Sequence, residues 1–375
     1  MARSPTFVHE RADWPELTWD AEALAAALAN LRHRQGRWHG RMEALGFEVR
    51  AEASFHVLTA DALKTSAIEG EHLNPDQVRS SLARRLGLPT AGLPRPSRDV
   101  DGLVEMLLDA TQRYAEPLTK QRLFSWHAAL FPTGRSGLRK LRIGAWRTQA
   151  SGPMQVVSGP IGRERVHFVA PEARRVEAEM RRFLEWFERP SSDDPVLRAG
   201  LAHLWFVTIH PFEDGNGRIG RAIADLALAR AERSPERFYS LSAQFDAERK
   251  DYYRELEAAQ RGDVDATRWL AWFLGCLGRA IDGAESTLAA VVRKAHVWRR
   301  IEREPLSERQ RKVLGRLLDG FEGKLTTSKY AKLAKCSQDS ALRDVRELLE
   351  RGLLARNEGG GRSVSYRFVD FGDDG

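Results

Sequence analysis

The spacing of apolar residues along the chain predicts a mainly helical protein. Leucines at helical spacing lie on one side of a helix expected over about 20–45. A second helix is expected over about 47–69, because Gly70 is a typical helix terminator. Residues 83–96 contain three prolines and two glycines and predict a loop. Helices near 98–114 and 118–131 follow.

Residues 144–171 change to β-type spacing. The β-branched segments 156–157 and 166–169 flank a glycine-rich turn at 158–162, which predicts a β-hairpin. Pro171 is then expected at the start of a helix.

The most apolar helix is predicted over 196–209, after a polar linker at 189–195. Its uniformly apolar composition indicates burial at the centre of a helical bundle. Further helices are expected over about 220–231, 246–261 and 264–298.

The pattern changes again after about residue 304. Ser307 and Gln310 form a capping box that opens a helix. The elements expected after it are short helices at 327–334 and 338–351 and strands at 353–355 and 364–368, around glycines 359–361. Three helices followed by a two-stranded hairpin are typical of a winged helix-turn-helix domain.

Composition narrows the class of protein. The chain has 375 residues, enough for two or three domains, and 30% of them are charged. The first residues lack the apolar segment of a secretory signal, and charge interrupts every apolar stretch before it reaches membrane-spanning length. Two distant cysteines, Cys276 and Cys336, make neither a disulfide framework nor a zinc site. We therefore expect a cytoplasmic protein with no membrane partner.

The net charge of +7 and the pI near 9.6 permit contact with nucleic acid or another polyanion. Arginine is, however, scattered over nearly every predicted helix. This distribution favours solvated Arg/Glu faces over a single basic surface.

Residues 209–221, IHPFEDGNGRIGR, concentrate groups suited to phosphate chemistry. His210 precedes a proline, so its backbone leaves the helix and its imidazole is delivered at the helix end. Residues 214–217 form a loop of exposed N–H groups that runs into the next helix, which is an anion site. Arg218 and Arg221 are three residues apart and can face the same anion.

Asp214 adds a hard oxygen ligand suited to magnesium beside phosphates. One base, one carboxylate, an anion-binding loop and two arginines suit phosphoryl or nucleotidyl transfer. The loop is not a Walker P-loop, because no Lys-Ser/Thr pair closes it.

These residues match every specified position of the Fic-domain signature HPF-x-(D/E)-GNGR-x-x-R, and the chain resembles that family over about residues 10–285. The resemblance implies a Fic-type helical bundle with a β-hairpin flap. Family members transfer AMP from Mg-ATP to a Ser, Thr or Tyr hydroxyl of a target protein. His210 would be the general base.

The resemblance also implies the ATP contacts. Asp214 would hold Mg²⁺, and Asn216 with the loop amides of Gly215 and Gly217 would bind the α- and β-phosphates. Arg218 would contact the β-phosphate and Arg221 the γ-phosphate. Kinase relatives carry lysine at the position of Gly217, so glycine favours AMP transfer.

The segments after the motif resemble the adenosine-binding part of the family. Tyr252, Tyr253 and Gln260 are candidates for the adenine end, although some relatives place asparagine at the position of Gln260. Ordinary helix packing is the alternative for the tyrosines. The hairpin at 154–169 resembles the Fic flap, which would align a target segment by strand addition.

Thr65, Glu69 and Gly70 match the Fic inhibitory pattern (S/T)-x-x-x-E-(G/N). The resemblance implies an intramolecular ion pair between Glu69 and Arg221 that competes with the γ-phosphate. Glu69 could instead be a surface residue that closes a helix, or it could also orient a water for removal of AMP.

The N-terminal stretch from Trp19 to Gly87 is similar to a domain found with a subset of bacterial Fic proteins. The domain division predicted from these patterns is 1–97 as the N-terminal region with the inhibitory helix, 98–285 as the Fic catalytic core, 286–303 as a linker helix and 304–375 as the winged helix domain.

Two alternatives to an autoinhibited AMP transferase stay open. The chain could be a DNA-binding winged-helix regulator with a nucleotide-sensing Fic core. The predicted recognition helix carries Arg343 and Arg346 but also Asp339, Asp344 and Glu347, so DNA contact through 304–370 and protein docking are both compatible with its charge. The enzyme could also use a different nucleotide or a phosphocholine donor. The target protein is not specified, and a homodimer stays open.

Overall fold

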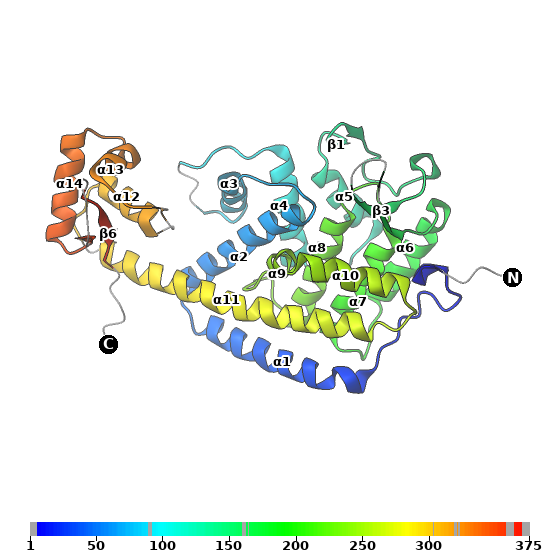
Figure 1. The fold of residues 1–375 in the computed structure, drawn as a ribbon. Helices are drawn as coiled ribbons and strands as arrows, with labels where there is room; N and C mark the ends of the chain where they lie inside the picture. Colours follow the sequence, from blue (N-terminus) through cyan, green and yellow to red (C-terminus); the bar gives the residue numbers. More distant parts are fainter. Residues whose placement is uncertain are drawn as a thin grey trace. The chain divides into compact units, whose positions relative to one another are not determined.

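A computed structural model describes residues 6–88, 92–159, 163, 165–302, 304–318, 321, 323–357 and 364–369. The chain divides into two compact units, Met1–Ser286 and Thr287–Gly375 (Figure 1). Helix α11 (Thr267–Glu302) runs through this division. Each unit has a hydrophobic core of its own.

The first unit is built mainly from helices, which confirms the mainly helical part of the predicted fold class. Its first five helices are α1 (Ala21–Glu43), α2 (Phe47–Ile68), α3 (Pro75–Arg85), α4 (Arg98–Gln112) and α5 (Lys120–Leu130). The next five are α6 (Ala173–Glu188), α7 (Pro195–Ile209), α8 (Asn216–Glu232), α9 (Leu241–Ala247) and α10 (Arg249–Arg261). Between α5 and α6 lie the short strands β1 (Arg135–Ser136) and β2 (Arg139–Lys140), then β3 (Gln155–Ser158) and β4 (Arg165–Val169). Among the described residues, no helix is both long and apolar enough to cross a membrane.

Helix α2 ends where the sequence predicts. Gly70 has a φ of +84°, in the left-handed region that favours glycine. Its N–H donates to the carbonyl of Ala67 at 2.9 Å, and the N–H of Glu71 donates to the carbonyl of Ser66 at 3.0 Å. These two bonds make a Schellman motif, so the chain turns sharply at the end of α2.

The sequence prediction missed α3, and the loop predicted over 83–96 is wrong for residues 83–85, which form its last turn. Asn74 caps the helix through its side-chain oxygen, and Pro75 occupies the first turn. Both start signals are visible in the sequence. The proline-rich residues that follow obscured how far the helix extends.

Three other predicted boundaries differ from the structure. Helix α8 begins at Asn216, one turn earlier than predicted, because the glycine loop leads directly into it. The single helix predicted over 246–261 is two helices, α9 and α10, with a break at Glu248. Helix α6 begins at Ala173, so Pro171 precedes the helix instead of opening it.

Helices α7 and α8 form the centre of the first unit. Every residue of α7 from Val196 to Ile209 is buried apart from Arg198, which confirms the predicted central helix. A Cβ atom at Gly220 would lie 2.7 Å from Cγ1 of Val207, so the close approach of the two helices depends on this glycine. Helices α2, α4, α5 and α6 pack around the pair (Figure 1).

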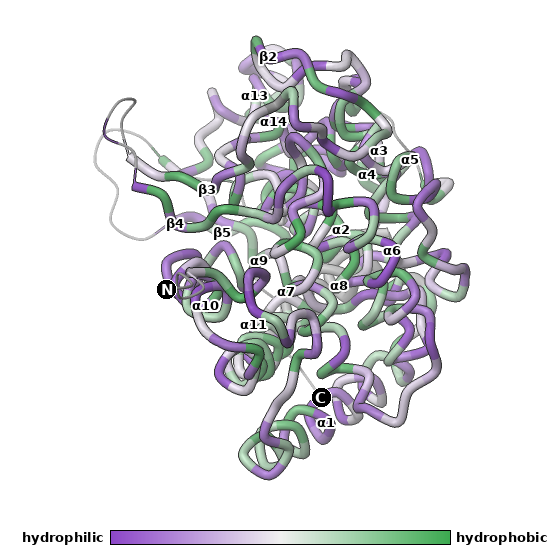
Figure 2. The backbone as a smooth tube through the Cα atoms, turned by 90° about the vertical axis from the view of Figure 1, so that its right-hand side faces the viewer, coloured by the Kyte–Doolittle hydropathy of each residue, from purple (hydrophilic) through white to green (hydrophobic). Residues whose placement is uncertain are grey.

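Strands β3 and β4 pair antiparallel, which confirms the predicted hairpin. Residues 160–162 of the predicted turn, and residue 164 of the predicted hairpin, lie outside the described residues. The hairpin is attached to α10, which lies beside it in Figure 2. Nε of Arg261 donates to the carbonyl of His167 at 3.1 Å, and Nδ1 of His167 donates to Glu257 at 2.7 Å.

Besides the end of α11, the second unit contains three helices and one hairpin among its described residues. They are α12 (Glu308–Leu318), α13 (Thr327–Ala334), α14 (Gln338–Glu350), β5 (Leu354–Arg356) and β6 (Tyr366–Phe368). The predicted capping box is present, because the N–H of Ser307 donates to Gln310 Oε1 at 2.8 Å and the N–H of Gln310 donates to Ser307 Oγ at 3.3 Å. The predicted glycine turn at 359–361 lies outside the described residues.

Candidate active site

The C-terminal end of α7 presents His210 in a left-handed backbone conformation, with φ 53° and ψ 59°. Its N–H donates to the carbonyl of Phe206 at 3.0 Å, and the proline that follows prevents the helix from continuing. A non-glycine residue in this region costs roughly 1–2 kcal/mol. The surrounding contacts must therefore hold His210 in place.

The ring of His210 is arranged as a base. Its Nδ1 lies 3.1 Å from the carbonyl of Val207, which can only accept, so Nδ1 carries the proton and Nε2 keeps its lone pair. Burial lowers the pKa of His210, and the charge of Arg147 also lowers it, whereas Glu69 and Asp214 act in the opposite direction. A neutral imidazole with Nε2 available can accept a proton at neutral pH.

Asn216 closes the loop between α7 and α8. Its Oδ1 accepts from the N–H of Phe212 at 2.9 Å, and its Nδ2 donates to the carbonyl of Phe212 at 2.9 Å. Oδ1 of Asp214 accepts from the N–H of Gly215 at 2.6 Å. The Asn216 amide thus fixes the shape of the loop here, and its predicted phosphate contact stays a prediction.

The start of α8 has the features of an anion site. The N–H groups of Asn216, Gly217 and Arg218 lie in the first turn, where a helix offers no acceptor for them. The helix dipole adds a partial positive charge at the same place. Arg218 and Arg221 are only 4% and 2% exposed, so their charges act in a largely water-free setting.

Glu69 contacts Arg221, as the sequence motif predicts. Nη2 of Arg221 donates to Glu69 Oε1 at 2.7 Å. Arg221 also donates from Nε to Thr65 Oγ1 at 2.7 Å and from Nη2 to the Thr65 carbonyl at 2.8 Å. The end of α2 therefore occupies the second arginine of the motif.

Gly217 lies directly against Glu69. A Cβ atom at position 217 would come within 2.1 Å of Glu69 Oε1 and 3.0 Å of its Cδ. Any other residue at 217 would displace the carboxylate. The structure thus adds a local reason for glycine at this position, beyond the donor orientation expected from the family.

A second carboxylate, that of Glu71, pairs with the other motif arginine. Nη1 of Arg218 donates to Glu71 Oε2 at 2.7 Å, and the guanidinium lies over the ring of Phe131 at 5.1 Å. Glu69 and Glu71 flank the Schellman turn at Gly70, and both side chains contact arginines of α8. Sequence reasoning missed Glu71, and its only signal was a position just past the helix terminator.

Arg147 is a further residue that sequence reasoning missed. It is 3% exposed, and its Nε donates to the carbonyl of His210 at 2.8 Å. It lies between the two hairpins, in no helix or strand, so no periodicity marks it as buried.

Two of the three residues predicted at the adenine end are buried. Tyr252 is 2% exposed, and its hydroxyl shares a hydrogen bond of 2.9 Å with Nε2 of His203. Gln260 is also buried, against α7. Tyr253 is 37% exposed, and its hydroxyl donates to the carbonyl of Ile68 at 3.3 Å. The packing alternative describes Tyr252, whereas Tyr253 faces the end of α2.

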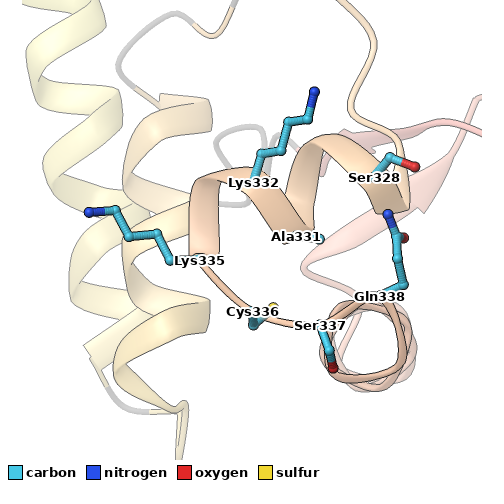
Figure 3. Close-up of a pocket in the computed structure, with 7 residues that line it drawn as sticks. All are labelled: Ser328, Ala331, Lys332, Lys335, Cys336, Ser337 and Gln338. Atoms are coloured by element: carbon cyan, nitrogen blue, oxygen red, sulfur yellow. The ribbon is translucent and has the colours of Figure 1, made fainter.

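The second unit has a surface hollow at the turn between α13 and α14 (Figure 3). Its lining residues are Ser328, Ala331, Lys332, Lys335, Cys336, Ser337 and Gln338. In Figure 3 the side chains of Lys332 and Lys335 extend outward from α13, so positive charge lies at the edge of the hollow.

Comparison with known protein families gives two matches. Residues 117–228 match the Fic/DOC family, and residues 7–88 match a domain of unknown function, DUF4172. The two segments contain, respectively, the His210–Arg221 motif and the Glu69 segment that pairs with it.

Curated relatives match parts of the chain. Protein adenylyltransferase Fic of Nematostella vectensis is 34% identical over 116 residues, which is 30% of this chain and 25% of the relative. Protein adenylyltransferase fic-1 of Caenorhabditis briggsae is 28% identical over 255 residues, which is 64% of this chain and 46% of the relative. The chain thus spans between a quarter and about half of the length of these relatives.

A solved structure shares the fold. The crystal structure of a Fic family protein from Desulfovibrio desulfuricans G20 aligns with a TM-score of 0.51 and 24% identity, covering 92% of this chain and 96% of that one. A Fic domain protein from Bacteroides thetaiotaomicron aligns with a TM-score of 0.52 and 18% identity, covering 69% of this chain and 97% of that one.

Proposed function

Because this chain belongs to the Fic/DOC family, with a DUF4172 domain before its Fic domain, we propose that it is a protein AMP transferase. It would move AMP from Mg-ATP to a Ser, Thr or Tyr hydroxyl of a target protein. Distant relatives named protein adenylyltransferase support this activity. The observation that carries the proposal is the lone pair on Nε2 of His210, held next to the anion site at the start of α8.

In the proposed reaction, Nε2 of His210 takes the proton of the target hydroxyl. The hydroxyl oxygen forms a bond to the α-phosphorus of ATP. The bond from that phosphorus to the bridging oxygen breaks, and pyrophosphate leaves with the electron pair. The N–H groups of α8, together with Arg218 and Arg221, would hold the phosphates and offset the charge that develops on them.

Asp214 would hold the magnesium ion. Its Oδ1 accepts one N–H, and a carboxylate has further lone pairs for a cation. In the part of the chain that the structure describes, no group of three or more His, Cys, Asp or Glu could bind a metal unaided. This fits Mg²⁺, which is commonly bound by one or two carboxylates and the phosphates of the substrate.

Two carboxylates at the end of α2 would act as a brake on this reaction. Arg221 is bound by Glu69 and Arg218 by Glu71. ATP needs the same guanidinium groups for its γ- and β-phosphates. Each ion pair therefore competes with a phosphate. ATP would bind weakly, or with its α-phosphate misaligned for attack, until the end of α2 moves away from the two arginines.

The hairpin β3–β4 would dock the target protein. An extended target segment could pair with its edge, which would present a hydroxyl near the end of α7.

Incorporation of label from α-labelled ATP with Mg²⁺ tests the activity. The chains to compare are wild type, Glu69→Gly, and Glu69→Gly combined with His210→Ala. We expect far more label on the protein itself in Glu69→Gly than in the other two chains, because this variant has its base and lacks its main brake. Equal labelling of the single and double variants would exclude His210 as the base. Absence of label from all three, with a panel of nucleotide and CDP-choline donors also tried, would contradict the proposed activity.

A second candidate function concerns the second unit, whose three helices and hairpin we assign to a winged helix that binds DNA. Two acidic residues of the candidate recognition helix α14 are paired internally: Asp344 with Arg309, and Glu347 with Arg351. Arg343 and Arg346 on the same helix are exposed. The ion pairs thus remove part of the negative charge of α14, while Asp339 and Glu350 of the same helix are exposed as well.

Fluorescence anisotropy of the full chain with labelled duplex DNA, over a salt series, tests this second function. We expect binding that weakens as salt rises, with a shallower salt dependence in Arg343→Ala/Arg346→Ala. His210→Ala should bind DNA as wild type does. Absence of binding at low salt would contradict the assignment.

A further inference from the structure

Arg147 is a buried guanidinium whose acceptors are backbone carbonyls. It is 3% exposed. Nε donates to the carbonyl of His210 at 2.8 Å, and Nη2 donates to the carbonyls of Ile209 at 3.3 Å and of Pro171. Its own backbone N–H donates to the carbonyl of Pro211 at 2.9 Å. One residue thus contacts three consecutive carbonyls at the end of α7 and a fourth beyond β4.

The chemistry of these contacts distinguishes Arg147 from the motif arginines. Arg218 and Arg221 pair with carboxylates, whereas burial alone shifts the pKa of Arg147, lowering it to about 10. The group is still charged at neutral pH. Burying a charge without a counter-ion is unfavourable, so a rigid, planar set of donors at this place indicates a geometric requirement.

That requirement is visible in the backbone of His210. Its left-handed conformation is unfavourable for a residue with a side chain and persists only where the surroundings fix it. The bonds from Arg147 fix the carbonyls on both sides of the His210 Cα atom and that of Pro211. The direction of the imidazole follows from this backbone.

The bond to Pro171 extends the same control to the flap. Pro171 comes two residues after β4 (Arg165–Val169), and the N–H of the residue between them, Ala170, donates to the carbonyl of Met154 at 2.9 Å, next to β3. The base of the hairpin and the backbone of His210 are therefore joined to one guanidinium.

We propose that Arg147 is a positioning residue for AMP transfer: it sets the distance between Nε2 of His210 and the hairpin β3–β4 that would carry the target hydroxyl. The inference rests on the proposed function, because it takes His210 as the base and the hairpin as the docking strand. Arg147 touches neither reactant and acts through the backbone of His210 and Pro171. A shift of about 1 Å in such a base can cost about 100-fold in rate.

The chain offers a matched control in Arg198. Its Nη2 donates to the carbonyls of Trp186 at 2.7 Å and Arg189 at 3.3 Å, at the end of α6, and burial lowers its pKa as well. Arg198 thus also closes a helix end through carbonyls, but no hydrogen bond of its side chain reaches the His210 segment within the described residues. Loss of either arginine removes three side-chain hydrogen bonds to carbonyls, and loss of Arg198 also removes its ion pair with Asp193.

The kinetic experiment uses the full chain in the Glu69→Gly background, with Arg147→Met, Arg147→Lys and Arg198→Met. Self-labelling from α-labelled ATP gives kcat and the KM for ATP. For Arg147→Met we expect kcat to fall about 10- to 100-fold while the KM for ATP changes less than about threefold, because the base moves and the phosphate site does not. Arg147→Lys should recover part of kcat, since an ammonium can replace some of the bonds. Arg198→Met should keep kcat.

A spectroscopic measurement separates this inference from the activity itself. In protein labelled with ¹⁵N-histidine, the His210 signals, assigned with His210→Ala, should show a proton on Nδ1 in the parent and in Arg198→Met. In Arg147→Met the ring should populate both tautomers, because its bond to Val207 is no longer fixed.

The two measurements also distinguish failure of this inference from failure of the proposed function. If the Glu69→Gly parent transfers no AMP, the proposed function has failed, and the spectra still test whether Arg147 fixes the His210 ring. Unchanged spectra and kcat in Arg147→Met, or equal losses in Arg198→Met, would overturn the inference. Arg147→Lys is judged by the same criteria if Arg147→Met does not fold.

Discussion

Each of the two units contains a junction between two helices in which the first helix ends at a non-glycine residue with a left-handed backbone. In the first unit α7 ends at His210 with φ 53°, and in the second α13 ends at Lys335 with φ 50°. A capping turn then leads into the next helix, α8 or α14. At the first junction two buried arginines three residues apart, Arg218 and Arg221, follow in α8. At the second, Ser337 caps α14, and the lysines of the turn extend into solvent (Figure 3).

The difference shows what converts a turn into a candidate site. A residue in the left-handed conformation is an ordinary feature of a turn between two helices, and it occurs at both junctions. The first adds two buried arginines, a helix start without a side-chain cap and a ring nitrogen held by a carbonyl, whereas at the second Ser337 caps α14. A reactive centre therefore depends on what converges on the turn from elsewhere in the fold.

The largest expected effect is at the left-handed residue of the first junction. In the Glu69→Gly background, His210→Ala should lower the rate of AMP transfer by about 10²- to 10⁴-fold, because the general base is lost. The measurement is the initial rate of labelling from α-labelled ATP. Lys335→Ala is the matched change at the second junction and should leave the rate unchanged. If His210→Ala keeps more than a tenth of the parent rate, His210 is not the general base and the distinction between the two junctions is wrong.

The next largest effect concerns the brake. Glu69→Gly should raise the labelling rate by about 10- to 100-fold, because a hydrogen bond between charged groups contributes about 1.5–3 kcal/mol. Glu350→Gly, which removes a carboxylate at the end of α14, is the control and should change nothing. Equal rates for wild type and Glu69→Gly would exclude Glu69 as a brake.

A smaller effect is expected at Glu71. Its side chain is 46% exposed, so solvent screens its bond to Arg218, and Glu71→Ala should raise the rate only about two- to fivefold. Because Arg218 would contact the β-phosphate, calorimetry should find tighter binding of both ATP and ADP and unchanged binding of AMP. Tighter binding of ATP alone would place the effect of Glu71 elsewhere.

The smallest effect is at the second junction. Lys335→Gly removes the strain of the left-handed residue and adds freedom to the unfolded chain, two effects that oppose each other. Thermal unfolding should give a change in stability below about 1 kcal/mol, and the labelling rate should be that of the parent. A lower labelling rate in this variant would show that the second junction also serves the reaction.

How much of the site the sequence predicted depended on where its residues lie along the chain. His210, the glycine loop, Arg218 and Arg221 are contiguous, so proline, glycine and helix rules were enough to place them on one turn. Glu69 was found only because it belongs to a second recognisable motif, which includes the glycine that ends α2.

Glu71 and Arg147 could not be predicted in the same way. Glu71 lies 147 residues from its partner Arg218, and Arg147 lies 63 residues from His210. Their roles depend on tertiary packing, which brings the end of α2 and the segment before β3 to one place. The adenine contacts of Tyr252 and Tyr253 stay a prediction, because an amphipathic helix indicates that both tyrosines lie near the site but not which of them is buried.

The brake itself is tested most directly by the affinities of wild type and Glu69→Gly for ATP and ADP, measured by calorimetry with Mg²⁺. ADP lacks the γ-phosphate with which Glu69 would compete for Arg221. We predict that Glu69→Gly binds ATP about tenfold or more tightly than wild type does, whereas its affinity for ADP changes less than about twofold. Equal gains for the two nucleotides, or no gain for either, would contradict the account.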